Sequence, residues 1–287
     1  MDVPGYALIT GAASGIGLAT ARAFALEGSA GLALVDLSSA ALDAAESLIL
    51  SLFSSSTNLS FSTANLSSSS AKTSSPPKIL KFPISVTDES AVINTIQSVK
   101  ETFGRIDYVV NAAGIALKHP GGTAFCATED FQRVVDVNVN GTFYVLREAA
   151  RIMLDQEPIL SERDGRPLQR GSIVNFGSIQ GVAGITLSTA YTTTKHAVIG
   201  LTRTASEDYA ARGLRINAIC PGYTETPMTT KNPEVLKAME ERVATAVPME
   251  RMGKASEIAD GVLYLAGGRS SFVTGSVLMV DGGYTCR

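Results

Sequence analysis

The 287-residue chain contains no tryptophan, two histidines and three cysteines. Cys126, Cys220 and Cys286 are odd in number and far apart, so they form neither a metal-ligand cluster nor a disulfide framework. We therefore expect reduced thiols, a reducing compartment such as the cytoplasm, and no bound metal.

Runs of one charge and long apolar runs are also missing. A formal net charge of −3 without a long basic stretch argues against nucleic acid as the main partner. No apolar run approaches the ~20 residues of a membrane-spanning helix, and the N-terminus lacks the basic and apolar regions of a secretory signal. The hydrophobic content of 45% instead predicts a soluble globular protein with no membrane partner.

The N-terminal part is typical of a strand, a glycine-rich turn and a helix. Residues 6–10 (YALIT) form a short apolar run that suits a strand buried in a parallel sheet. The turn at residues 11–17 (GAASGIG) follows, and a helical pattern continues to near Gly28. Such glycines let the backbone approach a pyrophosphate, whose charge meets the N–H groups at the helix start. An ordinary glycine-rich turn is the alternative.

Asp36 closes a second expected strand, at residues 32–35. It lies about 20 residues beyond the glycines, where an acidic side chain hydrogen-bonds the adenosine ribose hydroxyls. A carboxylate there repels a 2′-phosphate, and neither Ser14 nor Leu37 is a basic residue that could bind one. We therefore expect NAD(H) to be preferred to NADP(H). The alternative is that Asp36 is a loop residue or the N-cap of the next helix.

Beyond Asp36, strands and helices alternate to the end of the chain. The expected strands span residues 79–82, 106–110, 172–176, 214–219 and 277–280. The expected helices span residues 40–53, 88–103, 129–156, 189–212 and 255–267. This alternation predicts an α/β fold, with a doubly wound, mostly parallel sheet and helices on both faces, in a single domain over residues 1–287.

Three stretches depart from this alternation. Residues at about 54–77 are rich in serine, and we expect a mobile surface insertion there. Residues 157–170 are expected to be a loop. Within residues 227–251 the helical pattern is interrupted by Pro233, which suits a short helix pair acting as a lid over the substrate.

Tyr191 and Lys195 are four residues apart in an expected helix, so they lie on one face. A nearby ammonium lowers the pKa of a phenol, which is near 10 in free tyrosine. The pair therefore predicts a general acid/base for moving a proton on or off a hydroxyl or carbonyl oxygen. Because this spacing also arises by chance, a half-buried tyrosine beside a solvated lysine is the alternative.

Further polar residues follow other expected strands. Residues 111–114 (NAAG) and Ser178 both lie at carboxyl ends of strands, the edge where open α/β sheets bind ligands. The small residues at 112–114 suit a cofactor ring lying against the backbone, or a simple packing turn. Asn138 lies inside an apolar helix, where a buried amide needs partners. It is either a structural bridge or part of a polar relay, and the residue type alone favours the bridge.

Together these pieces resemble the short-chain dehydrogenase/reductase family over nearly the whole chain. The matching residues, in the family's order and close to its spacings, are Thr10 to Gly17, Asn111 to Gly114, Asn138, Ser178, Tyr191, Lys195, Pro221, Gly222 and Thr226. Each motif is weak alone, but the combination is specific.

The resemblance implies a catalytic role for four residues. Tyr191 would be the acid/base, and Lys195 would lower its pKa and hold the nicotinamide ribose. Ser178 would hydrogen-bond the substrate oxygen. Asn138 would hold a water in a proton relay, an interpretation that the resemblance favours over the structural bridge. Residues 221–226 would pass over the nicotinamide.

Two positions depart from the family pattern. Ser85 stands where many relatives have an aspartate that contacts adenine, so we expect adenine contacts from the Val86 backbone. Gly177 stands where relatives often have serine, which we interpret as harmless. The expected cofactor-binding residues, besides Tyr191 and Lys195, are Gly11, Ser14, Gly15, Ile16, Gly17, Asp36, Leu37, Val86, Asn111, Ala112, Gly114, Pro221, Gly222, Thr224 and Thr226.

The resemblance implies an NAD(H)-dependent oxidoreductase that interconverts a secondary alcohol and a ketone. We expect a mostly apolar substrate, alicyclic or aromatic, because the pocket stretches contain Val182, Ile185, Leu187, Met228 and Met239. The alternatives are an NADP(H)-dependent ketone reductase, an epimerase or dehydratase of a biosynthetic pathway, and a non-catalytic NAD(H)-binding sensor. The family also suggests a homotetramer, or a homodimer, with the helices that begin near Glu129 and Thr189 pairing between subunits.

Overall fold

A seven-stranded sheet forms the centre of the computed structural model, which describes residues 3–54, 75–161, 164–231 and 233–286. The strand order is β11-β8-β7-β4-β1-β2-β3, and every neighbouring pair is parallel. The strands are β1 (Tyr6–Thr10), β2 (Gly31–Asp36), β3 (Lys78–Pro83), β4 (Tyr108–Asn111), β7 (Gly171–Phe176), β8 (Leu214–Pro221) and β11 (Val277–Val280). The predicted doubly wound parallel sheet is confirmed.

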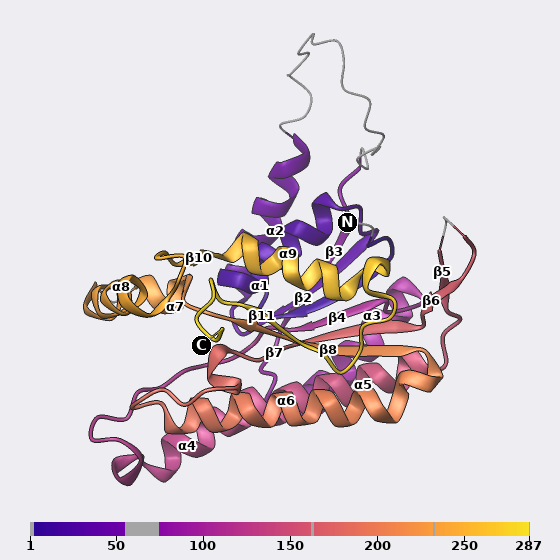
Figure 1. Ribbon diagram of the computed structural model, residues 1–287. Coiled ribbons are helices and arrows are strands. Elements are labelled where there is room, and N and C mark those ends of the chain that lie inside the picture. Colours follow the sequence, from indigo (N-terminus) through magenta and orange to yellow (C-terminus); the bar gives the residue numbers. More distant parts are fainter. Residues whose placement is uncertain (1–2, 55–74, 162–163, 232, 287) are drawn as a thin grey trace.

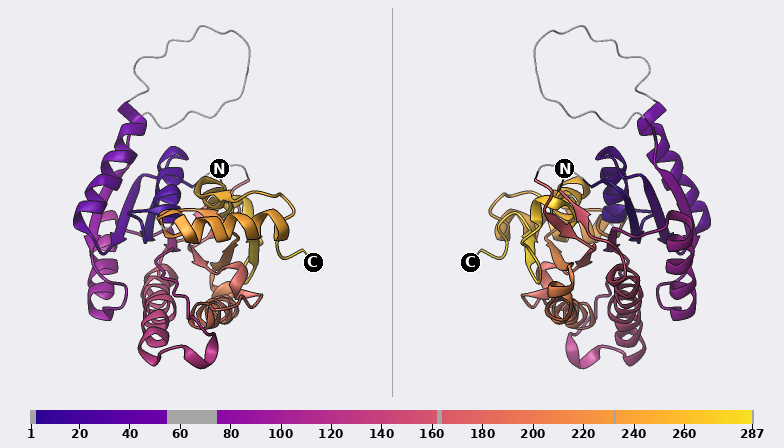
Figure 2. Two further views of the ribbon diagram at one scale, coloured as in Figure 1. Left: turned by 90° about the vertical axis from the view of Figure 1, so that its left-hand side faces the viewer. Right: turned by 90° about the vertical axis from the view of Figure 1, so that its right-hand side faces the viewer.

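Helices cover both faces of this sheet (Figures 1 and 2). One face packs against α1 (Gly15–Leu26), α2 (Ser39–Ser54) and α9 (Ala255–Ala266). The other packs against α3 (Glu89–Phe103), α5 (Thr142–Leu154) and α6 (Thr189–Tyr209). Strands β1, β2, β4, β7 and β8 are therefore almost wholly buried, as their near-continuous apolar sequences require.

The sheet changes direction of winding at β1. The chain runs from β1 through β2 to β3 on one side, and β4 then pairs with the other side of β1. Ligands of open α/β sheets bind in the crevice at such a switch point, beyond the carboxyl ends of the strands. The fold thus places the site between the end of β1 and the end of β4.

The expected helix at residues 129–156 is interrupted in the structure. It consists of α4 (Thr128–Val135), a π-helical segment (Asp136–Gly141) and α5. The wider turn contains Asn138, whose carbonyl accepts a hydrogen bond from the Thr142 hydroxyl at 2.8 Å. Insertions of this kind are common at functional sites.

The prediction of a loop without secondary structure at residues 157–170 is also wrong. This stretch contains a small antiparallel pair, β5 (Ile159–Leu160) and β6 (Pro167–Gln169), because backbone groups of these two stretches hydrogen-bond to one another. Most of the serine-rich stretch at about 54–77 lies outside the described residues. Within the described ranges, no helix has both the length and the apolar character needed to cross a bilayer.

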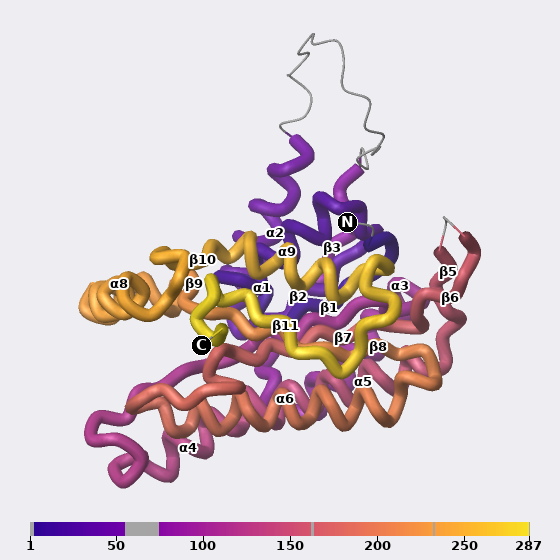
Figure 3. Tube along the Cα trace, in the orientation of Figure 1, coloured from indigo at the N-terminus to yellow at the C-terminus, as the bar shows by residue number. Residues whose placement is uncertain are grey.

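The predicted helix pair within residues 227–251 is present as α7 (Pro227–Thr230) and α8 (Pro233–Ala246). Two short strands, β9 (Thr224–Glu225) and β10 (Gly253–Lys254), pair at its base. The Cα trace shows that α8 and the connection from β4 to α4 lie at the same end of the molecule (Figure 3). The pair is therefore positioned beside the crevice.

A buried arginine joins β8 to the end of α9. Arg215 is 4% exposed, and its guanidinium donates to the carbonyls of Leu265 and Ala266, at 2.7 Å each, and to the Gln169 side chain at 2.7 Å. The last carbonyls of a helix have no partner within the helix. A positive charge at this end also interacts favourably with the negative end of the helix dipole. Burial lowers the pKa of Arg215 to about 10, so it remains charged at neutral pH.

We expect Arg215→Leu to destabilise the protein by about 3 kcal/mol or more, because several buried carbonyls lose their partner. Urea unfolding measured by circular dichroism would give the change. The exposed Arg212, three residues earlier, provides the control, and Arg212→Ala should shift the unfolding free energy by less than about 0.5 kcal/mol. Equal effects of the two substitutions would contradict the assignment.

Candidate active site

A cleft of about 1450 Å³ opens beyond the carboxyl ends of β1, β4, β7 and β8. It extends from Asp36 at the end of β2 to Met228 and Met239 on the helix pair α7–α8. A drug-sized ligand fills a pocket of about 300–1,000 Å³. The cleft is therefore large enough for a dinucleotide together with a small substrate.

The glycine turn between β1 and α1 forms one wall of this cleft. Gly11 and Gly15 have φ angles of +66° and +53°, which favour glycine. A Cβ on Gly17 would lie 2.0 Å from the Gly11 carbonyl oxygen, so glycine is also needed for close packing there. Gly15, Ile16 and Gly17 form the first turn of α1, whose N–H groups lack helical acceptors. This donor set fits the pyrophosphate of a dinucleotide.

Asp36 stabilises the same turn from the end of β2. One carboxylate oxygen accepts the Ala13 N–H at 3.0 Å, and the other accepts the Leu37 N–H at 2.8 Å. Both Asp36 and Leu37 line the cleft. Asp36 is not the N-cap of α2, because the Ser38 hydroxyl accepts the Ala41 N–H instead. Its carboxylate oxygens retain lone pairs that could accept hydrogen bonds from ribose hydroxyls.

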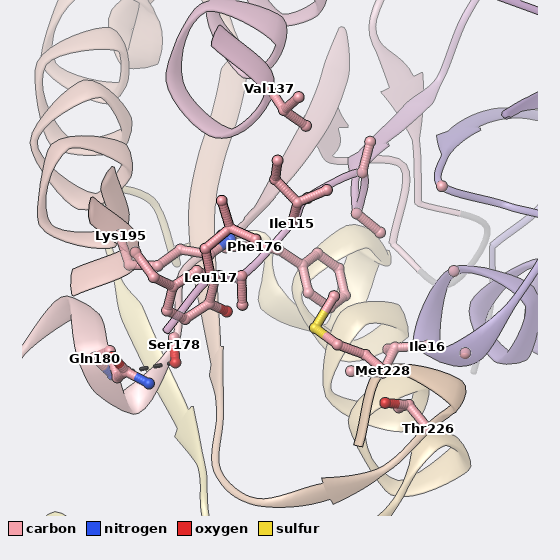
Figure 4. A pocket seen from close by; sticks show the side chains of 18 of the residues that line it. Ile16, Ile115, Leu117, Val137, Phe176, Ser178, Gln180, Lys195, Thr226 and Met228 are labelled. Carbon is pink, nitrogen blue, oxygen red and sulfur yellow. Dashed lines mark hydrogen bonds between the residues drawn. The ribbon is translucent and has the colours of Figure 1, made fainter. Parts of the chain in front are cut away.

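Three polar side chains, Ser178, Tyr191 and Lys195, line the cleft. Figure 4 labels two of them, Ser178 and Lys195. Ser178 follows β7, and its hydroxyl accepts the Gln180 N–H at 3.1 Å. Tyr191 and Lys195 come from α6, and the Lys195 ammonium lies 5.4 Å from the centre of the Tyr191 ring. That ammonium also donates to the Phe176 carbonyl at 2.7 Å, which fixes α6 to the end of β7.

Burial dominates the electrostatics of this cluster. It raises the pKa of Tyr191 to about 12, although a hydrogen bond with Ser178 acts in the opposite direction. It lowers the pKa of Lys195 to about 8. Loss of water costs the phenolate more than its neighbours return, so the pKa of Tyr191 is raised on balance, and the lowering effect of Lys195 stays a prediction. At neutral pH the phenol keeps its proton.

Asn138 lies behind the cleft and not in its lining. The side chain is 1% exposed. Its oxygen accepts the Ile115 N–H at 2.9 Å, and its nitrogen donates to the Ile115 carbonyl at 2.9 Å and to the Thr194 hydroxyl at 3.1 Å. Both amide hydrogens are therefore used within the protein. The structural bridge is therefore present in the structure, and the relay role of Asn138 stays a prediction.

Asn111 also lies outside the lining of the cleft. It is 2% exposed and donates to the Asn175 side chain at 2.9 Å. Asn175 donates in turn to the Thr202 hydroxyl at 2.9 Å. The Asn111 side chain therefore supports the floor of the cleft from below, and a contact between this residue and a cofactor stays a prediction.

Gly177 and Cys220 fit together directly below Ser178. A Cβ on Gly177 would lie 2.4 Å from the Cys220 sulfur. Cys220 is fully buried, and burial raises the pKa of its thiol to about 11. The glycine at this position is therefore required by the thiol on the neighbouring strand.

The cleft brings together most of the residues expected from the sequence. Those that line it are Gly11, Ser14, Gly15, Ile16, Gly17, Asp36, Leu37, Val86, Ala112, Gly114, Ser178, Tyr191, Lys195, Pro221, Gly222, Thr224 and Thr226. Gly114 lies close to two polar groups, since a Cβ there would be 3.2 Å from the Asn138 side-chain oxygen and 3.7 Å from the Lys195 nitrogen. Among the described residues, no group of three or more His, Cys, Asp and Glu side chains could hold a metal ion.

The substrate end of the cleft differs from the expectation. Ile185, Met228 and Met239 line it, but Val182 and Leu187 do not and are 46% and 44% exposed. Polar residues also line the cleft, among them Lys118, Gln180 and Ser188. Lys118 and Gln180 belong to stretches that were expected to supply pocket residues, the chain after Gly114 and residues 179–187, but neither residue was singled out. The position of Gln180, two residues after Ser178, was an available signal. No pattern in the sequence identifies Lys118, because its place depends on the path of the chain after β4.

Comparisons with known proteins agree with this architecture. A family model described as enoyl-(acyl carrier protein) reductase matches residues 56–285. The chain is 37% identical to the short-chain dehydrogenase fogB of Aspergillus ruber, over 99% of this chain and 98% of that protein. It is 35% identical to the levodione reductase of Leifsonia aquatica, over 96% of this chain and 92% of that protein.

Solved structures show the same similarity. The crystal structure of levodione reductase matches with a TM-score of 0.80 at 33% identity, covering 98% of this chain and 97% of that one. The structure of ElxO with NADP bound matches with a TM-score of 0.81 at 29% identity, covering 99% and 100%.

Proposed function

This chain belongs to the short-chain dehydrogenase/reductase family, and we propose that it interconverts a secondary alcohol and a ketone with NAD(H) as the preferred cofactor. Membership makes it an oxidoreductase that acts on CH–OH donors and uses a nicotinamide dinucleotide. The observation that supports the proposed roles is the meeting of Tyr191, Ser178 and Lys195 in one cleft with the glycine turn.

In the proposed mechanism, the bound nicotinamide supplies or accepts the hydride. Tyr191 donates a proton to the carbonyl oxygen in reduction and removes it in oxidation. Ser178 hydrogen-bonds and polarises the same oxygen. Lys195, anchored by the Phe176 carbonyl, holds the cofactor ribose, and Asn138 keeps α6 in register with the chain after β4.

The preference for NAD(H) is supported by Asp36. Family membership does not choose between the two nucleotides, since ElxO was solved with NADP bound. The carboxylate of Asp36 lines the cleft beside Leu37, and a 2′-phosphate placed there would meet its negative charge. The Val86 backbone and residues 221–226 would provide the adenine and carboxamide contacts.

The substrate body is proposed to be alicyclic or aromatic. Ile185, Met228 and Met239 support this because they supply apolar surface to the lining of the cleft. Helices α7 and α8 would act as the lid, within one catalytic domain. Met228, at 57% exposed, has room to move over a ligand.

We further propose a cytoplasmic homotetramer, or homodimer, with α4–α5 and α6 pairing between subunits. Phe143 on α5 supports this arrangement, since its ring is 37% exposed and available for a second chain. All three cysteines are free in the structure, which suits a reducing compartment.

Tyr191→Phe removes the proton donor while leaving the ring in place. We expect turnover to fall by about 10²- to 10⁴-fold with cofactor affinity nearly unchanged. Absorbance of reduced nicotinamide over a panel of cyclic ketones and secondary alcohols measures the loss. Tyr209→Phe, on the same helix outside the cleft, is the control. Near-normal turnover of the folded Tyr191→Phe variant would refute the assignment.

The direction of the reaction should depend on pH. Because burial raises the pKa of Tyr191 to about 12, its phenolate fraction grows about tenfold with each pH unit near neutrality. Oxidation needs the phenolate and reduction needs the phenol. We expect the initial rate of oxidation to rise between about pH 6 and about pH 7.5, below the pKa of about 8 at which Lys195 loses its charge, with no such rise in reduction. A flat profile for oxidation would show that another group accepts the proton.

Cofactor preference can be tested at Asp36. We expect the wild-type protein to bind NADH at least about tenfold tighter than NADPH, a difference of about 1.4 kcal/mol. Asp36→Asn keeps an oxygen for the Ala13 N–H but loses the charge. The difference in affinity between NADH and NADPH should therefore become smaller. Fluorescence titration of both nucleotides gives the ratio. Equal or tighter binding of NADPH by the wild type would overturn the preference.

A further inference from the structure

Lys118 places a positive charge at the substrate end of the cleft. The residue lines the cleft, and its ammonium donates to the Ser188 hydroxyl at 3.0 Å and lies 3.5 Å from the Thr186 carbonyl. Both partners are uncharged. Among the described residues, no acidic side chain forms an ion pair with it.

The position of this charge relates it to the reacting oxygen. Ser188 immediately precedes α6 and precedes Tyr191 by three residues, which is about one helical turn, or ~5 Å along the axis. The groups that fit the dinucleotide lie elsewhere in the cleft. The glycine turn follows β1, and Asp36 ends β2. The ammonium therefore faces the substrate region and not the pyrophosphate region.

Gln180 adds an oriented donor close by. Its side-chain oxygen accepts a hydrogen bond from the Thr192 hydroxyl at 2.9 Å. With the oxygen used in this bond, the NH2 group is the end left for a ligand. Gln180 lines the cleft beside Ser178 (Figure 4).

The two donors are held by the chain itself. Besides the Lys118 contacts, the His119 N–H donates to the Leu187 carbonyl at 2.9 Å, and the Thr123 and Thr189 hydroxyls are 2.8 Å apart. These bonds join the connection after β4 to the connection before α6. The ammonium is thus kept in place by neutral groups, which leaves its charge available.

We propose that Lys118 and Gln180 form a subsite for a carboxylate carried by the substrate, at a distance from the carbon that is oxidised or reduced. The Lys118 ammonium, which has no acidic partner among the described residues, matches the single negative charge of a carboxylate, and an ammonium with an amide N–H can bind its two oxygens. This deepens the proposed function and rests on it. The substrate class becomes an oxo or hydroxy acid with an apolar skeleton.

Binding of two non-reacting ligands tests the subsite without requiring turnover. Isothermal titration calorimetry of the full-length protein saturated with NADH would compare cyclohexanecarboxylate with its methyl ester. We expect the carboxylate to bind about tenfold to a hundredfold tighter. Lys118→Gln should abolish that preference, and Lys118→Arg should keep it. Equal affinities for the two ligands, or no binding of either, would overturn the proposal.

A matched variant separates charge recognition from support of the loop. Ser188→Ala removes a hydrogen bond from the same ammonium but leaves the charge, so the preference for the carboxylate should survive. If Lys118 only joined the two connections, both variants would weaken both ligands alike, and the subsite would be rejected.

Turnover of 4-oxocyclohexanecarboxylate and its methyl ester then distinguishes the two proposals. Reduction of both ketones at equal efficiency, dependent on Tyr191, would leave the alcohol–ketone function intact and reject the carboxylate subsite. Preferential binding of the carboxylate without Tyr191-dependent turnover would support the subsite and reject the assigned chemistry.

Discussion

The amide of Asn138 holds the two halves of the site in register. Three hydrogen bonds from one buried side chain connect the Ile115 backbone, which follows β4, to Thr194 on α6. A buried amide cannot leave these bonds without a large desolvation penalty, so the connection is close to rigid. Tyr191 and Lys195 lie on the same helix as Thr194, so the bond to Thr194 also fixes their position relative to the chain after β4. The π-helical turn at Asp136–Gly141 is the local distortion that brings the amide to this point.

Much of this architecture follows from patterns that the sequence displays. Strand β1, the glycine turn and α1 are predictable because an apolar run, a glycine-rich segment and a helical pattern of apolar residues follow one another in the sequence. Ser178 could be placed on the correct sheet edge because parallel strands end together. The spacing of Tyr191 and Lys195 by four residues is enough to place them on a common face of the helix.

The remaining features depend on tertiary packing, which no local pattern reports. The pKa of Tyr191 rises because surrounding elements exclude water, whereas its spacing from Lys195 suggested a fall. Asn111 and Asn138 have the right residue type and neighbourhood, but their partners turn them away from the cleft. Lys118 belongs to a connection without periodicity, so its contact with Ser188 emerges only from the folded chain.

The contact between Gly177 and Cys220 limits how this protein can evolve. A side chain cannot be added at Gly177 while the sulfur of Cys220 occupies the same space, with only 2.4 Å between the sulfur and an added Cβ. Loss of the sulfur alone would open a void beneath Ser178. The two positions therefore form an epistatic pair, in which one substitution is tolerated only in a background that already contains the other. A serine at position 177 would therefore require a smaller residue at position 220, so the two positions are expected to change together.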